Sequence, residues 1–189
     1  MIEIINIRHF GFEKVSFRVP LFTFAFLLFT FAFLLSAPAS AQRRDYLTDA
    51  EIELVRDAQQ IDLRIEVLVR AIDRRFEVLN NTTAAKKDSE KWGELPKGTR
   101  PELTSDITKI LQKAVDDVDD VAARSMDSKF FPKAFHKLVE AAQRFLPQFK
   151  TLLDQVKDEK ERGSILNSID LCNQIIEAAP KVPKEVKKK

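Results

Sequence analysis

Few residues in this chain are suited to acid–base or metal chemistry. His136 is the only histidine beyond residue 41, and Glu140 lies one helical turn after it. Zinc sites typically use about three or four protein ligands, so this pair is half a site at best. A haem pair would combine His136 with Met126, but a predicted helix break separates them. We therefore predict no enzyme activity, no cofactor and no metal site, and we interpret His136 as solvated or locally hydrogen-bonded.

Two further features could suggest chemistry. Cys172 is the single cysteine, so no intramolecular disulfide can form. It shares a stripe with Ile165, Ile169 and Ile176, which favours a buried apolar role; an intermolecular disulfide stays open if that stripe is exposed. The run Asp116–Asp120 lacks the glycine and the final glutamate of a calcium loop, and we interpret it as a solvated helix face.

The residues best suited to bind a partner are Trp92 and Leu95. They lie in residues 81–100, a polar segment without helical period that is long for a connection inside a compact domain. A tryptophan there can fold back and cap the protein, or it can stay exposed for a partner, as interface tryptophans often do. Capping is the simpler interpretation, and both are left open.

The N-terminus has the pattern of an export signal. A region with three basic residues precedes the uncharged apolar run Leu21–Leu35, and the small residues Ala39–Ala41 follow. The apolar run is shorter than the roughly 20 residues that span a bilayer. We therefore predict that residues 1–41 form a secretory signal peptide, cleaved after export, and not a permanent membrane anchor.

Composition indicates an ordinary globular protein without a nucleic-acid partner. Hydrophobic residues make up 44% of the chain and charged residues 32%. The formal net charge is +2, and it becomes +1 without residues 1–41, which hold three basic and two acidic residues. A nucleic-acid-binding domain would need a strongly basic face.

Apolar spacing predicts the elements that must position these residues. Over residues 48–80, apolar side chains recur every three or four positions, as on one side of a long helix, and Thr48 with Glu51 matches a capping box. The same spacing predicts three further helices, over residues 101–125, 131–158 and 164–179.

The breaks between these helices define the predicted fold. The charged stretch Lys157–Gly163, which ends in glycine, is expected to separate the third helix from the fourth, because continuing the phase of the third helix would place charged residues inward. Pro147 lies inside that helix, where the apolar phase continues and a kink is expected. Short connections favour antiparallel neighbours. We predict an all-α, antiparallel up-down bundle of about four helices over residues 42–180, followed by a basic disordered tail, residues 181–189.

Together these features favour an exported, non-enzymatic helical protein, secreted or periplasmic, that acts as an interaction or structural module of the envelope or the extracellular space. Its partner would be an unidentified envelope protein or polymer, and a homo-oligomer is also compatible with the sequence. The alternative is a small-ligand or cofactor carrier with a site in the bundle core. A coloured preparation, or a ligand retained through purification, would favour the carrier.

Export is expected to remove residues 1–41. Intact-mass and N-terminal mass spectrometry of the native protein should then find Gln42, as glutamine or in its cyclised form, at the N-terminus. A native protein that still carries Leu21–Leu35 would contradict the signal-peptide prediction.

Overall fold

The computed structural model describes residues 44–80, 89–125 and 129–182. The chain divides into two units, Met1–Arg44 and Asp45–Lys189, and the fold below is that of the second unit. The predicted signal peptide and all but two residues of the predicted tail lie outside the described residues.

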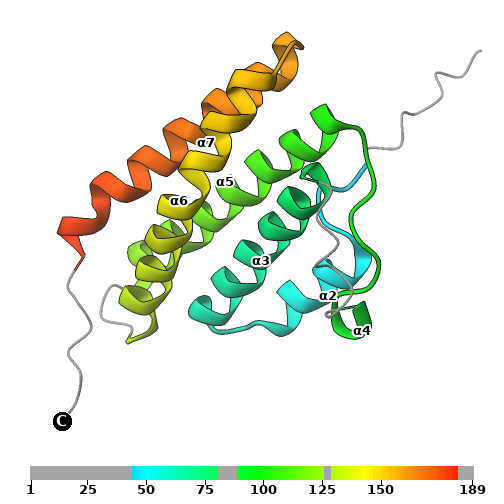
Figure 1. The fold of residues 1–189 in the computed structure, drawn as a ribbon. Helices are drawn as coiled ribbons and strands as arrows, with labels where there is room; N and C mark the ends of the chain where they lie inside the picture. Colours follow the sequence, from blue (N-terminus) through cyan, green and yellow to red (C-terminus); the bar gives the residue numbers. More distant parts are fainter. Residues whose placement is uncertain (1–43, 81–88, 126–128, 183–189) are drawn as a thin grey trace, which may run out of the picture. The chain divides into compact units, whose positions relative to one another are not determined.

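The described residues form six packed α-helices and no strand, which confirms the all-α prediction. The helices are α2 (Asp49–Asp57), α3 (Ile61–Leu79), α4 (Ser89–Trp92), α5 (Arg100–Ser125), α6 (Phe130–Gln155) and α7 (Glu159–Ala178), with a 3-10 turn, η2 (Ala179–Lys181), at the end. Helix α3 packs against α5 and α6, and α7 packs against the same two helices (Figure 1). The short α2 lies against α3, and α4 lies against α2.

The core is built from the apolar stripes that the sequence predicts. Ile65, Leu68 and Ile72 of α3 are fully buried. Near the end of α3, the ring of Phe76 packs on two rings of α6, with centroids 5.6 Å from Phe145 and 5.2 Å from Phe149. Aromatic pairs at this separation stabilise a core beyond the area they bury. Helix α3 is therefore central to the packing.

No helix within the described ranges is long and apolar enough to cross a membrane.

The prediction of one helix over residues 48–80 is wrong, because the chain breaks between α2 and α3. Ala58 leaves the helical conformation, and Gln60 is extended. The freed carbonyl of Ala58 accepts a hydrogen bond from Arg64 Nε at 3.0 Å. The apolar spacing continues across the break, so periodicity alone could not reveal it. The capping box of Thr48 and Glu51 is present as predicted.

The helix boundary predicted at Gly163 is also wrong. Helix α6 ends at Gln155, and α7 begins at Glu159, so Gly163 lies inside α7. The start of α7 is fixed by Asp158, whose carboxylate accepts a hydrogen bond from the Glu161 backbone N–H at 2.8 Å. An aspartate at the N-cap satisfies a backbone donor that the helix leaves free, and it outweighs the stop signal of a later glycine.

The other predicted segments need smaller corrections. The predicted loop 81–100 contains the short helix α4, and α5 begins at Arg100. Helix α6 runs through Pro147, so the prediction that one helix continues across this proline is confirmed.

Two glycine substitutions test the local backbone. A β-carbon at Gly163 would meet no atom within 4 Å, so Gly163→Ala should raise the free energy of unfolding by about 0.5–1 kcal/mol, as expected for alanine in a helix interior. Gly93 has φ +64° and a β-carbon there would lie 3.1 Å from Ala50 Cβ, so Gly93→Ala should be destabilising by about 1 kcal/mol or more. Urea denaturation measures both, and a loss of stability in Gly163→Ala would contradict the assigned helix.

Candidate functional site

Three charged side chains are buried together where α2 meets α3. Glu51 is 0% exposed, Arg74 2% and Arg75 1%. Glu51 Oε1 accepts hydrogen bonds from Arg74 Nη1 at 2.7 Å and from Arg75 Nη1 at 3.0 Å. Glu51 Oε2 accepts from Arg75 Nη2 at 2.8 Å and from the Thr48 backbone N–H at 2.9 Å. One carboxylate of α2 therefore lies between two guanidinium groups of α3.

Arg75 connects this ion cluster to the segment before α2 and to α5. Its Nη2 donates to the Tyr46 carbonyl at 2.5 Å, and its Nη1 donates to the Ala71 carbonyl at 2.6 Å. Asp106 Oδ2, on α5, lies 4.0 Å from Arg75 Nε, and Asp106 is also buried. A second carboxylate thus balances the second guanidinium, as buried charges require.

Arg74 connects the ion cluster to the segment that follows α4. Its Nη2 donates hydrogen bonds to the carbonyls of Gly93 at 3.2 Å and Glu94 at 2.5 Å. The same guanidinium lies 5.6 Å from the ring centroid of Trp92, close enough for a cation–π contact. Arg74 therefore fixes the backbone that carries the predicted site residue Trp92.

The ion cluster keeps Glu51 ionised. Burial by itself would raise the pKa of this carboxyl, but the hydrogen bond and charge of Arg75, the Thr48 N–H and the charge of Arg74 outweigh burial and lower the pKa below its ordinary value of 4.5. Glu51, Arg74 and Arg75 pair with one another inside the protein and hold α2 and the backbone after α4 on α3, although the buried Arg75 Nε has no hydrogen-bond partner among the described residues.

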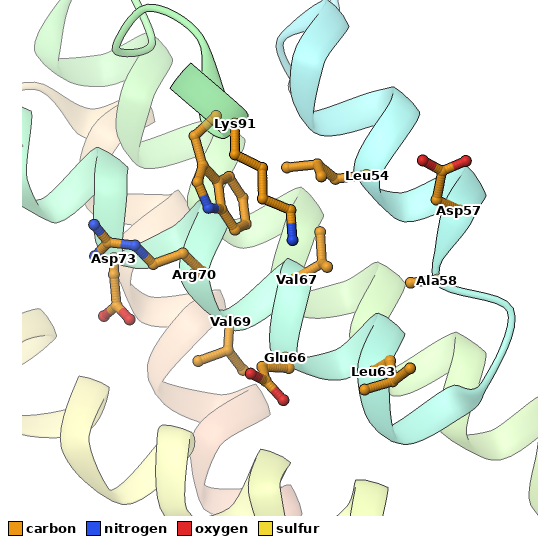
Figure 2. Close-up of a pocket in the computed structure, with 11 residues that line it drawn as sticks. Leu54, Asp57, Ala58, Leu63, Glu66, Val67, Val69, Arg70, Asp73 and Lys91 are labelled. Carbon is orange, nitrogen blue, oxygen red and sulfur yellow. The ribbon is translucent and has the colours of Figure 1, made fainter. Parts of the chain in front are cut away.

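Next to this ion cluster lies a groove of about 600 Å³ between α2, α3 and α4, which we call the α2–α4 groove (Figure 2). Its apolar lining residues are Leu54, Ala58, Leu63, Val67, Val69 and Trp92. Its charged lining residues are Asp57, Glu66, Arg70, Asp73 and Lys91. Among the described residues, Leu63 is an exposed large apolar side chain, with 46% of its surface accessible. The groove thus combines an apolar surface with a charged edge.

A second hollow continues this surface across α3 towards α6. It has a volume of about 430 Å³ and shares Glu66 and Val69 with the α2–α4 groove. Lys137 Nζ of α6 lies 2.6 Å from Glu66 Oε2, and Arg144 of α6 pairs with Asp73 at 2.5 Å. These two carboxylates of α3 are therefore paired within the chain.

The structure brings only one of the two predicted site residues to the groove. Trp92 is half-buried and lines the groove, whereas Leu95 is half-buried but does not line it. Sequence reasoning missed Leu63, Val67 and the part played by Arg74. The sequence held one signal that could have identified Leu63: this residue is apolar but lies off the predicted stripe of α3.

Cys172 and His136, the two residues considered above for redox or metal chemistry, both pack against other side chains. Cys172 is fully buried, which confirms the prediction, and burial raises the pKa of its thiol to about 12. The His136 ring lies edge-on to Phe135, with centroids 6.1 Å apart. Within the ranges that the structure describes, no three His, Cys, Asp or Glu residues are grouped to hold a metal ion. Met126 lies outside those ranges.

No family model, curated protein or solved structure matches this sequence.

Replacing Glu51 by Gln should lower the free energy of unfolding at pH 7 by about 3–5 kcal/mol, because it leaves two buried arginines without their shared counter-charge. Glu53→Gln on the same helix is the control. Its pair with Arg56 is exposed, so the change should cost about 1 kcal/mol or less.

The pH dependence of the free energy of unfolding, measured for the wild type and for Glu51→Gln, provides a second readout. Because folding lowers the pKa of Glu51, the stabilisation that ionised Glu51 gives the folded state is complete above pH 4.5. It is lost as the pH falls through the lower pKa of the folded state. The stability difference between wild type and Glu51→Gln should therefore narrow only below pH 4.5. A difference that is already lost between pH 7 and 5 would show that Glu51 is not held ionised by the arginines.

Proposed function

We propose that this chain is an exported, non-enzymatic interaction protein of the cell envelope or the extracellular space, and that the α2–α4 groove is its contact surface. The observation that carries the proposal is that the exposed Leu63 and the half-buried Trp92 line one groove next to the buried ion cluster. The signal-peptide pattern of residues 1–41 supports a secreted or periplasmic location.

The composition of the groove supports binding to a macromolecule. Interfaces typically centre on a few aromatic and apolar side chains and are bordered by charged residues. Trp92 supplies a rigid aromatic surface, and Leu54 and Val67 add apolar area nearby. Because Arg74 holds the backbone at Gly93 and Glu94, little ordering remains to be done when a partner binds.

The proposed scaffold is an antiparallel arrangement of the four long helices α3, α5, α6 and α7, following a cleaved signal peptide. The short connection between α6 and α7 supports opposite directions for these two neighbours. In this scheme α2 and α4 are additions to the scaffold that form the binding surface.

A small-ligand carrier is the second candidate, and an apolar hollow between α5, α6 and α7 favours it. This hollow has a volume of about 200 Å³, and its lining includes Val118, Leu138, Leu171 and Ile175. Ligand pockets usually measure roughly 300–1,000 Å³, so this one is small for a carrier. We therefore place the interaction function first.

Site-specific photo-crosslinking in the native cells tests the interaction function. A photo-reactive amino acid at position 63 should give a crosslinked adduct in the envelope or secreted fraction, because Leu63 borders the proposed contact surface. The matched control is position 166 on α7, where Leu166 is similarly exposed, at 42%, but has the polar neighbours Arg162 and Asp170 one turn away. Absence of an adduct at position 63, or equal adducts at both positions, would contradict the proposal.

A further inference from the structure

We infer that the partner that fits the α2–α4 groove is a second copy of this chain, and that two copies associate about a two-fold axis through this groove. The inference rests on the proposed function, because it names the partner of the same surface.

The charged residues that line the groove fall into two groups. Three of the five charged lining residues are already paired within the chain: Arg70 Nη1 lies 2.7 Å from Glu77 Oε1, and Glu66 and Asp73 pair with lysine and arginine of α6. Asp57 and Lys91 differ from them. Both are exposed, and in the described part of the chain neither side chain has an ion pair or a hydrogen bond.

Asp57 and Lys91 lie on different helices. Asp57 is the last residue of α2, and Lys91 belongs to α4, so they extend from two different elements that border one groove (Figure 2). They carry opposite charges, and their sum is zero. A uniformly basic partner would be attracted by Asp57 and repelled by Lys91, and an acidic partner would meet the reverse.

A second copy related by a two-fold axis can pair with both charges. In a two-fold interface each contact occurs twice, so that residue i meets residue j of the other copy and residue j meets residue i. A surface with one acid and one base on separate elements, neither paired within the described ranges, can be complementary to its own copy. Asp57 of each copy then pairs with the partner's Lys91, and both free charges are neutralised.

The apolar residues are arranged in the same self-complementary way. Leu63 is 46% exposed and borders a groove of about 600 Å³ that Leu54, Val67 and Trp92 also line. Each copy thus presents an exposed leucine and an apolar groove that can receive one. Reciprocal contact removes both leucines from water, and the adjoining hollow of about 430 Å³ extends the surface towards α6.

Charge reversal tests the pairing in the purified protein, expressed from its full-length gene. Sedimentation velocity at low ionic strength should show a dimer for the wild type, because salt screens exposed charges. Asp57→Lys and Lys91→Asp should each raise the dimer dissociation constant by about tenfold or more, since each creates two like-charge contacts across the axis. Both positions are exposed, so the fold should be retained, and circular dichroism checks this.

The decisive measurement is an equimolar mixture of the two variants. In the mixed dimer, the lysine introduced at position 57 of one copy meets the aspartate introduced at position 91 of the other copy, and the unchanged Lys91 meets the unchanged Asp57. Every contact across the axis again joins opposite charges, so dimerisation should return to near the wild-type level. If Asp57 and Lys91 instead attracted each other within one chain, mixing would restore nothing. A mixture that stays monomeric therefore overturns the inference.

The apolar contact has its own matched pair of variants. Leu63→Asp should abolish dimerisation, whereas Leu166→Asp on α7 should leave it unchanged. A wild type that remains monomeric at about 100 µM, or equal effects of the two leucine variants, would also overturn the inference, since specific dimers of standard interface size are normally populated well below that concentration.

Failure of the inference and failure of the proposed function give different results. A monomeric wild type whose position 63 crosslinks in cells to a component of another mass would overturn the dimer and leave the interaction function standing. A dimer that obeys the mixing test, in a protein that gives no adduct in the envelope or secreted fraction, would support the dimer and overturn the function as proposed.

Discussion

The salt bridge of Glu51 with Arg74 and Arg75 is the interaction on which the rest of this structure depends. Glu51 lies on α2 and both arginines lie on α3, 23 and 24 residues further along the chain. In one continuous helix these groups would be about 36 Å apart, because each residue adds about 1.5 Å. The break at Ala58–Gln60 is therefore required for the contact. Once formed, the contact determines where α2, the backbone after α4 and Trp92 lie.

Burial of this salt bridge requires that α2 and the backbone after α4 lie close to α3. Removing ions from water is costly, so an ion pair in a protein interior persists only when further hydrogen bonds satisfy it. Here the backbone carbonyls of Tyr46, Ala71, Gly93 and Glu94 supply them. Each carbonyl belongs to a segment that borders the groove or leads to it. The same bonds that make the buried charges tolerable thus shape the surface proposed for binding.

The sequence predicted the helical class, the core stripe and the buried Cys172, because these depend on local periodicity. It did not predict the break after α2, since the apolar phase of α2 and α3 is continuous and the arginine contacts that the break permits are distant from Glu51 in sequence. The start of α7 was missed because the cap at Asp158 competes with the glycine signal five residues later. For the site, Trp92 was identified by its chemistry and Leu63 could have been identified by its position off the apolar stripe, but the part played by Arg74 depends on tertiary contacts that spacing does not encode.

Helix α2 has nine residues, too few to be stable in water by itself, and it is held on the protein by the Glu51 carboxylate and by the apolar packing of Ile52 and Val55. The region of α2 and α4 is therefore expected to open as a local unit at a lower free energy than the four long helices, exchanging its amide hydrogens sooner. Since these elements form two sides of the groove, opening removes the surface proposed for binding. A partner that bound only the docked form would stabilise it by mass action and would protect this end of the molecule from proteolysis.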